Sequence, residues 1–218
     1  MMNIADRVHK FSHWVCWGVG RVIFRCLFRF EVEGGETLKN LKGPLLIGFN
    51  HSSWLDAFFV YAAIPAQAAI APVRFLAWHV YYWLALPVML LSGSLPVKRR
   101  IALDTNLKKA VAVLEKGGTI ALAPEGKRRH IGRPRHGRRG ISYLALKTNT
   151  PILPIYIDGA VGLKLADIFK KRQITVYIGK PFFLPKYESN QPLQENFDLL
   201  VNCSELVMNK INETKNAE

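Results

Sequence analysis

The chain has 218 residues, half of them hydrophobic, and its 30 Lys and Arg against 16 Asp and Glu give a formal charge of +14. This length and apolar content predict one sizeable domain with a full core, and three cysteines without metal-binding or paired spacing exclude a disulfide framework and favour a reducing compartment. The positive surplus indicates an anionic partner, which is either a nucleic acid or an anionic membrane together with a phosphorylated substrate.

The first predicted element is a largely apolar helix over residues 8–30. Arg21, Arg25 and Arg29 recur at every fourth position, so they form one cationic stripe. A membrane-spanning helix is disfavoured because a central arginine is costly in a bilayer. Two interpretations remain: the helix docks on the protein's own core, or it lies in the membrane interface with its arginines at lipid phosphates. We assign residues 1–30 as an N-terminal amphipathic, membrane-associated helix.

The next stretch holds a histidine between a strand and a helix. Residues 44–49 are apolar and predict a buried strand, and residues 54–63 predict a helix. His51 lies between them, and Asp56 follows five positions later. Residues five apart do not share a helix face, so the two side chains meet only if His51 precedes the helix and Asp56 points back from its first turn. That contact would fix one ring nitrogen of His51 and leave the other free to take a proton.

The same residues also fit a purely structural role. Ser53 and Asp56 match a helix capping box, in which the carboxylate only satisfies backbone N–H groups. His51 would then be an ordinary turn residue. The rest of the chain has to decide between these alternatives.

A second apolar run covers residues 75–91 and is interrupted by His79 and Pro87. Its length is close to that of a membrane span, so a segment that enters the bilayer or lies at its interface is one interpretation. A lining for an acyl chain and a plain buried helix are the other two.

The second half of the chain alternates strands and helices. Helices are predicted over residues 101–116, 140–147 and 193–212, and strands over residues 94–100, 119–123, 151–158 and 173–179. This alternation predicts an α/β fold with a mixed, largely parallel sheet flanked by helices. Because ligands bind beyond the carboxyl ends of such strands, we expect Asn50-His51, Lys98-Arg99 and Glu125-Gly126 to converge on one edge.

Four blocks, in this order, resemble the glycerolipid acyltransferase family, which includes the 1-acylglycerol-3-phosphate acyltransferases. The blocks are His51-x4-Asp56, residues 93–99 ending in an arginine, Pro124-Glu125-Gly126 and residues 150–154 with two prolines. The resemblance extends from about residue 44 to residue 158, with order and spacing intact. It implies that residues 31–218 form an acyltransferase domain.

The resemblance also implies a mechanism. His51 would act as the general base on an acceptor hydroxyl, and Asp56 would orient the ring and stabilise the imidazolium. The hydroxyl would attack the thioester of acyl-CoA or acyl-carrier protein directly, with these donors as co-substrates and with no metal or permanently bound cofactor. Backbone N–H groups around Gly126 are candidates for binding the oxyanion.

Arg99 and Arg128 are the residues implied to bind the acceptor's phosphate, because a forked guanidinium suits that group. Their alternative is an ordinary surface charge. Glu125 would either hydrogen-bond the acceptor or brace Arg128. The family usually has Thr-Arg-Ser after Pro-Glu-Gly, whereas Lys127 and Arg129 flank Arg128 here, and the residues before Arg99 also depart from the family pattern. Both differences bear on which acceptor fits.

The implied function is the transfer of a fatty acyl group to a lysophospholipid, with lysophosphatidic acid as acceptor and phosphatidic acid as product. Alternatives are another acceptor, such as a lyso-aminolipid, and a non-catalytic basic domain that binds membrane or nucleic acid. We expect no nucleic-acid partner, because that alternative leaves the apolar runs unexplained. The expected location is an anionic membrane surface, with the active site facing the cytoplasm. The basic run over residues 127–139 is either a solvated loop or a contact for lipid heads, CoA or the carrier protein.

Overall fold

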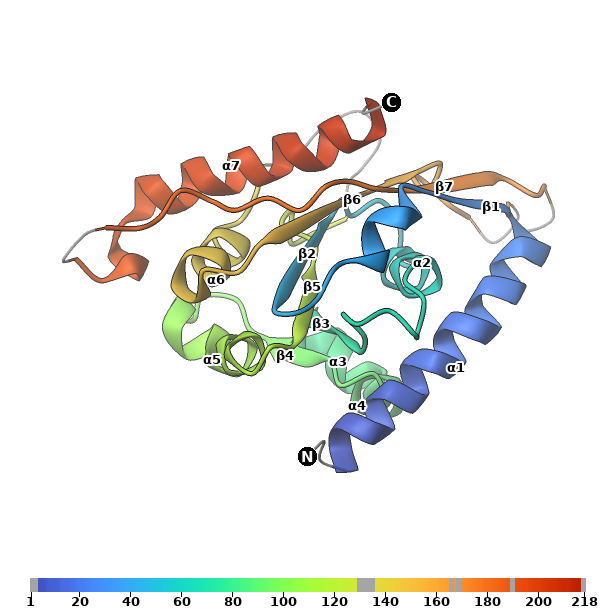
Figure 1. Ribbon diagram of the computed structural model, residues 1–218, viewed down its shortest axis with the longest axis horizontal. Helices are drawn as coiled ribbons and strands as arrows, with labels where there is room; N and C mark the ends of the chain where they lie inside the picture. The colour runs from blue at the N-terminus through green and yellow to red at the C-terminus, as the bar shows by residue number, and fades with distance from the viewer. Residues whose placement is uncertain (1–3, 129–135, 165–166, 168–169, 189–190, 217–218) are drawn as a thin grey trace.

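A computed structural model describes residues 4–128, 136–164, 167, 170–188 and 191–216. The strands in these residues are β1 (Arg29–Glu33), β2 (Leu45–Phe49), β3 (Val73–Trp78), β4 (Leu95–Val97), β5 (Thr119–Leu122), β6 (Ile152–Asp158) and β7 (Gln173–Ile178). They form one seven-stranded sheet in the order β1-β7-β6-β2-β5-β3-β4. Every neighbouring pair is parallel except β6 with β7. The predicted mixed, largely parallel sheet flanked by helices is confirmed (Figure 1).

Helices cover both faces of this sheet. They are α1 (Ile4–Leu27), α2 (Asp56–Ala63), α3 (His79–Leu84), α4 (Leu86–Leu91), α5 (Leu103–Glu115), α6 (Gly140–Thr148) and α7 (Phe197–Glu213), with short 3₁₀ turns η1 (Gly35–Lys39), η3 (Leu193–Glu195) and η4 (Thr214–Asn216). One hydrophobic cluster joins α1 and α2 to one face, and a second joins α5, α6 and α7 to the other (Figure 1).

The central strand β2 is buried along its whole length, as expected for a parallel strand covered on both sides. Ile47 belongs to the cluster under α2, and Leu46 belongs to the cluster under α6 and α7. At Gly48, an added Cβ would lie 3.0 Å from Ile141 Cδ1 and 3.2 Å from Ile211 Cδ1. The glycine therefore lets α6 and α7 pack closely against the strand that leads to His51.

Helix α1 ends at Leu27, three residues earlier than predicted, because the following residues form β1. Arg29 pairs with Gln173 of β7, so only Arg21 and Arg25 of the predicted stripe lie on the helix. Phe24 packs against Phe59 of α2, with ring centroids 4.8 Å apart. Other side chains of α1 face outward, so the helix docks on the core through one face and exposes apolar groups on another.

The apolar run over residues 75–91 is neither one buried helix nor one long segment. It forms β3 and then the short helices α3 and α4, and Pro87 lies in the first turn of α4. Trp83 and Leu84 are 64% and 77% exposed. No helix within the described parts of the chain is long and apolar enough to cross a membrane.

The remaining elements match the predicted ones to within a few residues. Helix α2 begins at Asp56 rather than residue 54, and the largest of these shifts is at α7, which begins at Phe197 rather than residue 193. Asn196 caps α7 by accepting a hydrogen bond from the Leu199 N–H at 3.2 Å. Within the predicted basic run, residues 129–135 lie outside the described residues.

Candidate active site

The carboxyl ends of β2 and β5 lie side by side, because these two strands are parallel neighbours. His51 follows β2, and Glu125 follows β5. The His51 backbone N–H donates a hydrogen bond to Glu125 Oε1 at 3.1 Å, and Glu125 is 2% exposed. The predicted convergence of these two strand ends therefore occurs. Glu125 holds the backbone at His51, which is a role that neither sequence-based alternative included.

His51 and Asp56 are in direct contact. His51 Nδ1 lies 2.8 Å from Asp56 Oδ2, and the imidazole is 30% exposed whereas the carboxylate is fully buried. Asp56 is the first residue of α2 and points back across the preceding loop. The geometry that the five-residue spacing requires is thus present.

The carboxylate of Asp56 also accepts hydrogen bonds from the loop. The backbone N–H groups of Ser52 and Ser53 donate to Oδ2 at 2.6 and 2.8 Å, and Ser53 Oγ donates to Oδ1 at 2.6 Å. The carboxylate therefore both satisfies loop N–H groups and orients the histidine, but Ser53 does not cap the helix, because α2 begins at Asp56 and its N-cap residue Leu55 makes no side-chain capping bond. One buried acid fixes the loop and the ring at once.

This arrangement defines the tautomer of His51. A carboxylate oxygen accepts, so Nδ1 of the neutral ring carries the proton and donates to Asp56 Oδ2. The lone pair then lies on Nε2, which makes that nitrogen a general base. The buried negative charge also stabilises the ring after it has taken a second proton.

Asn50 anchors the loop from the other side of β2. Its Nδ2 donates to the Ile157 carbonyl at 2.9 Å and to Ser52 Oγ at 3.1 Å, and its Oδ1 accepts from the Ile157 N–H at 2.6 Å. Asn50 is 1% exposed. A buried amide that pairs with both backbone groups of one β6 residue fixes where the chain turns toward His51. Its position directly after a buried strand was the only sequence signal for this role.

The two arginines predicted to bind phosphate are exposed at this end of the sheet. The Arg99 guanidinium stacks over the ring of Trp78 at 4.1 Å, beyond the end of β4, and Arg128 follows the Pro-Glu-Gly turn. The order of the sheet places β3 and β4 beyond β5. At about 4.8 Å per strand, the end of β4 lies roughly 10 Å from that of β5. Arg99 is thus farther from His51 than the turn that carries Glu125.

A further arginine, Arg138, covers this turn. A Cβ added at Gly126 would lie 2.5 Å from Arg138 Cδ and 2.6 Å from its Nε, so the arginine side chain lies directly on the glycine. The Arg138 N–H donates to the Pro124 carbonyl at 2.8 Å, and its carbonyl accepts from Ser204 Oγ at 3.1 Å. Nothing in the residue pattern distinguishes Arg138 from its neighbours in a run of basic residues.

Gly126 has a positive φ of 63°, a conformation that favours glycine. Its N–H donates to the Ala123 carbonyl at 3.1 Å. This N–H is therefore not free to bind an oxyanion, contrary to the role expected for it. The glycine serves the site by its shape, because it leaves room for Arg138. Within the part of the chain that the structure describes, no three His, Cys, Asp or Glu side chains group as metal ligands.

The sheet and the site together define an α/β protein with a partly exposed histidine, held by a buried carboxylate, beyond the carboxyl end of a central strand. Residues 29–158 match the profile of the family described as Acyltransferase. The chain belongs to this acyltransferase family.

Several curated relatives carry one name. The chain is 31% identical to a 1-acyl-sn-glycerol-3-phosphate acyltransferase of Limnanthes alba, over 73% of this chain and 56% of that protein. It is 29% identical to one of Borreliella burgdorferi, over 67% of this chain and 58% of that protein. A chloroplastic relative from Arabidopsis thaliana is 25% identical over 87% and 55% of the two chains. The chain thus spans about half the length of the curated relatives it matches.

One solved structure has the same fold. It is the crystal structure of the 1-acyl-sn-glycerophosphate (LPA) acyltransferase PlsC from Thermotoga maritima, with a TM-score of 0.65 and 18% sequence identity. The match covers 97% of this chain and 84% of that one.

Proposed function

We propose that the protein transfers a fatty acyl group from an acyl thioester to the free hydroxyl of lysophosphatidic acid and so forms phosphatidic acid. The observation that carries this proposal is the contact between His51 Nδ1 and the buried Asp56 at 2.8 Å, with the imidazole partly exposed. Membership of the acyltransferase family and the shared name of the relatives support the choice of reaction and acceptor.

In the proposed reaction His51 Nε2 takes the proton of the acceptor hydroxyl as its oxygen attacks the thioester carbonyl carbon. The new C–O bond gives a tetrahedral oxyanion, and the C–S bond then breaks. The imidazolium returns its proton to the departing sulfur, so the ring ends neutral. Asp56 keeps its charge throughout and stabilises the imidazolium across the 2.8 Å contact.

Binding of the acceptor's phosphate is assigned to the exposed arginines at this end of the sheet. Arg138 is added to Arg99 and Arg128, because its guanidinium lies on the turn whose Glu125 touches the His51 backbone. An arginine fork at this position suits a phosphate that accompanies a hydroxyl in reach of His51. Of these cations, Arg138 has a backbone held by hydrogen bonds on both sides, which fixes where its side chain begins.

An exposed apolar surface supports the proposed membrane association. Its members on α1, α3 and α4 are more than a third exposed and comprise Phe11, Trp14, Val80, Tyr81, Trp83, Leu84, Val88, Leu90 and Leu91. The Ser12 hydroxyl donates to the Leu91 carbonyl, so α1 and α4 are joined. Aromatic and aliphatic side chains on a strongly cationic protein fit the interface of an anionic bilayer.

The apolar surface also borders the catalytic edge. Strand β3 is parallel to β5, so the two strands end at the same edge of the sheet, where His51 and Glu125 lie. Helix α3 follows β3 directly and therefore starts at this edge. A lysolipid held in the bilayer would therefore reach His51 without leaving the membrane surface.

An acceptor screen tests the proposed function. Purified protein is incubated with labelled acyl-CoA or acyl-carrier protein and with lysophosphatidic acid, other lysophospholipids or a lyso-aminolipid, and the products are separated by thin-layer chromatography. We expect labelled phosphatidic acid from the wild type and none from His51→Ala. Failure to acylate any lysolipid, or a His51→Ala protein that works at the parent rate, would contradict the proposal.

A further inference from the structure

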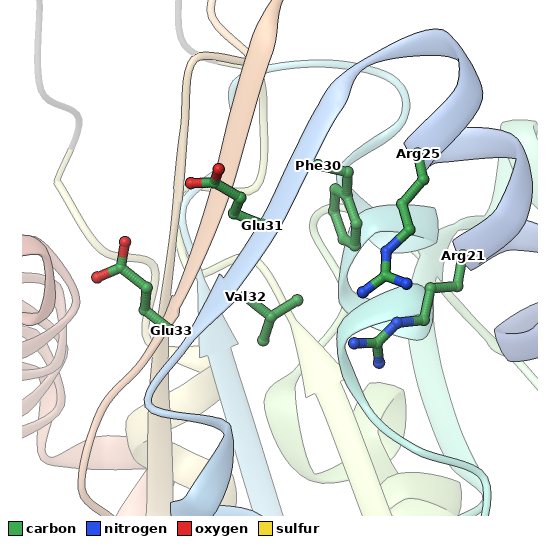
Figure 2. Close-up of a pocket in the computed structure, with 6 residues that line it drawn as sticks. All are labelled: Arg21, Arg25, Phe30, Glu31, Val32 and Glu33. Atoms are coloured by element: carbon green, nitrogen blue, oxygen red, sulfur yellow. The ribbon is translucent and has the colours of Figure 1, made fainter.

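A cavity of about 350 Å³ lies between α1 and β1 (Figure 2). Its lining residues are Arg21, Arg25, Phe30, Glu31, Val32 and Glu33. None of them belongs to the His51 site, and nothing in the proposed reaction uses them. Two arginines that share one cavity wall raise the question of what neutralises them.

The two guanidinium groups lie four residues apart on α1 and extend toward the side of β1 that carries Phe30 and Val32 (Figure 2). Among the residues that the structure describes, no carboxylate forms an ion pair with Arg21 or Arg25. Like charges at this helical spacing repel each other. Partial burial, reinforced by the charge of Arg25, lowers the pKa of Arg21. The pair therefore lacks a counter-charge within the described protein.

The two glutamates of the lining do not supply that counter-charge. Glu31 and Glu33 extend from the opposite side of β1 (Figure 2), as alternation along a strand requires. Gln173 Nε2 of β7 donates to Glu31 Oε2 at 3.4 Å, which directs this carboxylate over the sheet and away from α1.

The backbone of β1 adds donors to the same cavity. β1 is the edge strand, and the Arg29 N–H donates to the Arg172 carbonyl at 3.1 Å on the β7 side. Backbone groups alternate in direction along a strand, so the N–H and C=O groups of Phe30 and Val32 point to the unpaired edge beside α1. Two arginine forks and two edge N–H groups thus lie at this cavity as donors, next to the two edge carbonyls.

We propose that this cavity is a second, non-catalytic binding site for a phosphate group. A phosphate presents several acceptor oxygens and a charge that two guanidinium forks match, and edge N–H groups complete its shell. The volume exceeds that of a phosphate alone, so the group can carry a small substituent. The sources that share this chemistry are the headgroup of an anionic lipid and a free phosphate. The site goes beyond the proposed reaction, since it involves neither His51 nor the acceptor.

Arginine side-chain NMR tests the site directly. Protein labelled with ¹⁵N-arginine is titrated with inorganic phosphate and, separately, with short-chain phosphatidic acid below its micellar concentration. The Nε–Hε signals of the two arginines are assigned through their loss in Arg21→Gln and Arg25→Gln. We expect both signals to shift saturably. Shifts in both titrations identify a site for free phosphate as well as lipid, a shift with inorganic phosphate alone identifies a site for free phosphate, and a shift with the lipid alone identifies a headgroup site. Unshifted signals in both titrations would overturn the proposal.

Vesicle binding supplies a matched control. Arg21→Gln/Arg25→Gln and Lys108→Gln/Lys109→Gln each remove two exposed or half-exposed cations, from α1 and from α5. On vesicles of phosphatidylcholine and phosphatidic acid, we expect the α1 pair to bind at least about tenfold more weakly than the α5 pair if the lipid signals shift. Equal losses would show general charge attraction and overturn a headgroup site. Neither readout measures acyl transfer, so failure here and failure of the proposed function are separate results.

Discussion

Asp56 Oδ2 contacts His51 Nδ1 at 2.8 Å although a helix start separates the two residues: His51 lies in the loop after β2, and Asp56 opens α2. The backbone N–H groups of Ser52 and Ser53 converge on the same oxygen. The loop cannot change shape without moving the imidazole. Catalytic competence and local stability should therefore depend on the same carboxylate.

Asp56→Asn is expected to reduce both properties. The amide brings an N–H₂ group to a place where four donors already point at the carboxylate, and it removes the charge that stabilises the imidazolium. We expect the free energy of unfolding to fall by about 1–3 kcal/mol and kcat to fall by about 10²–10⁴. Urea denaturation measures the free energy of unfolding, and steady-state assays measure kcat. His51→Gln, which leaves Asp56 charged, should lose activity with a much smaller loss of stability.

Arg138→Ala is expected to weaken acceptor binding, because it removes the guanidinium that lies on Gly126. The KM for lysophosphatidic acid should rise by about tenfold or more, as for a charge-assisted hydrogen bond, while the KM for the acyl donor changes little. Arg139→Ala is the matched control, since the Arg139 guanidinium stacks on Phe197 at 4.2 Å. Equal effects of the two substitutions would argue against a specific role for Arg138.

Trp83→Ser/Leu84→Ser is expected to weaken binding to anionic vesicles. Each side chain contributes about 1.5–3 kcal/mol when it is fully buried, so sedimentation with vesicles should fall by at least about tenfold. Phe183→Ser, which alters a 61% exposed side chain between β7 and α7, is the control. Unchanged sedimentation of the double variant would exclude this surface as the membrane contact. Deleting residues 1–30 is a poorer test, because it also removes Phe24 and Phe28 from the core.

His13 is expected to make stability fall in mild acid. The ring is 2% exposed, accepts from the Val73 N–H at 3.2 Å and lies 3.2 Å from the Ile64 carbonyl. Burial lowers the pKa of His13 below its ordinary value of 6.5, although the Ile64 contact opposes this. Neutral His13 is thus favoured in the folded protein. The contribution of neutral His13 to the free energy of unfolding is complete above pH 6.5. It is lost as the pH falls through the lower pKa of the folded protein.

The test compares the wild type with His13→Gln by urea denaturation between about pH 8 and about pH 5. The difference in unfolding free energy between the two proteins should shrink as the pH falls. Titration of the groups that the two proteins share contributes equally to both and cancels. A difference that stays constant across this range would rule out His13 as the source.

The sequence allowed most of the architecture to be predicted, because the central strands β2 and β5 are continuous apolar runs and the helices α5 and α7 each have one apolar face. The predicted elements were wrong where pairing with a strand far away in the sequence overrode the local sequence pattern. Arg29 reads as part of the α1 stripe, but pairing with Gln173 makes it the first residue of β1. The run after Val73 reads as one apolar segment, but its first residues pair with β5.

The candidate site was likewise predicted only in part. The spacing of His51 and Asp56, together with the family resemblance, was sufficient to expect their contact. Arg138 was not recognisable, because its place depends on the packing of its side chain against Gly126 and on hydrogen bonds to Pro124 and Ser204. Such contacts join segments far apart in the chain and leave no periodic signal.

The single antiparallel pairing in the sheet has a mechanical consequence. Because β7 runs against β6, and β1 follows β7, the chain enters β1 at the edge where β2 leaves toward His51. The last turn of α1 is therefore tethered at the same edge of the sheet as His51, three strands away from β2, while its first half is joined to α4. On the proposed membrane surface, a tilt of α1 would turn this edge of the sheet with it, so the docking of one helix would also set the angle at which a lysolipid is presented to His51.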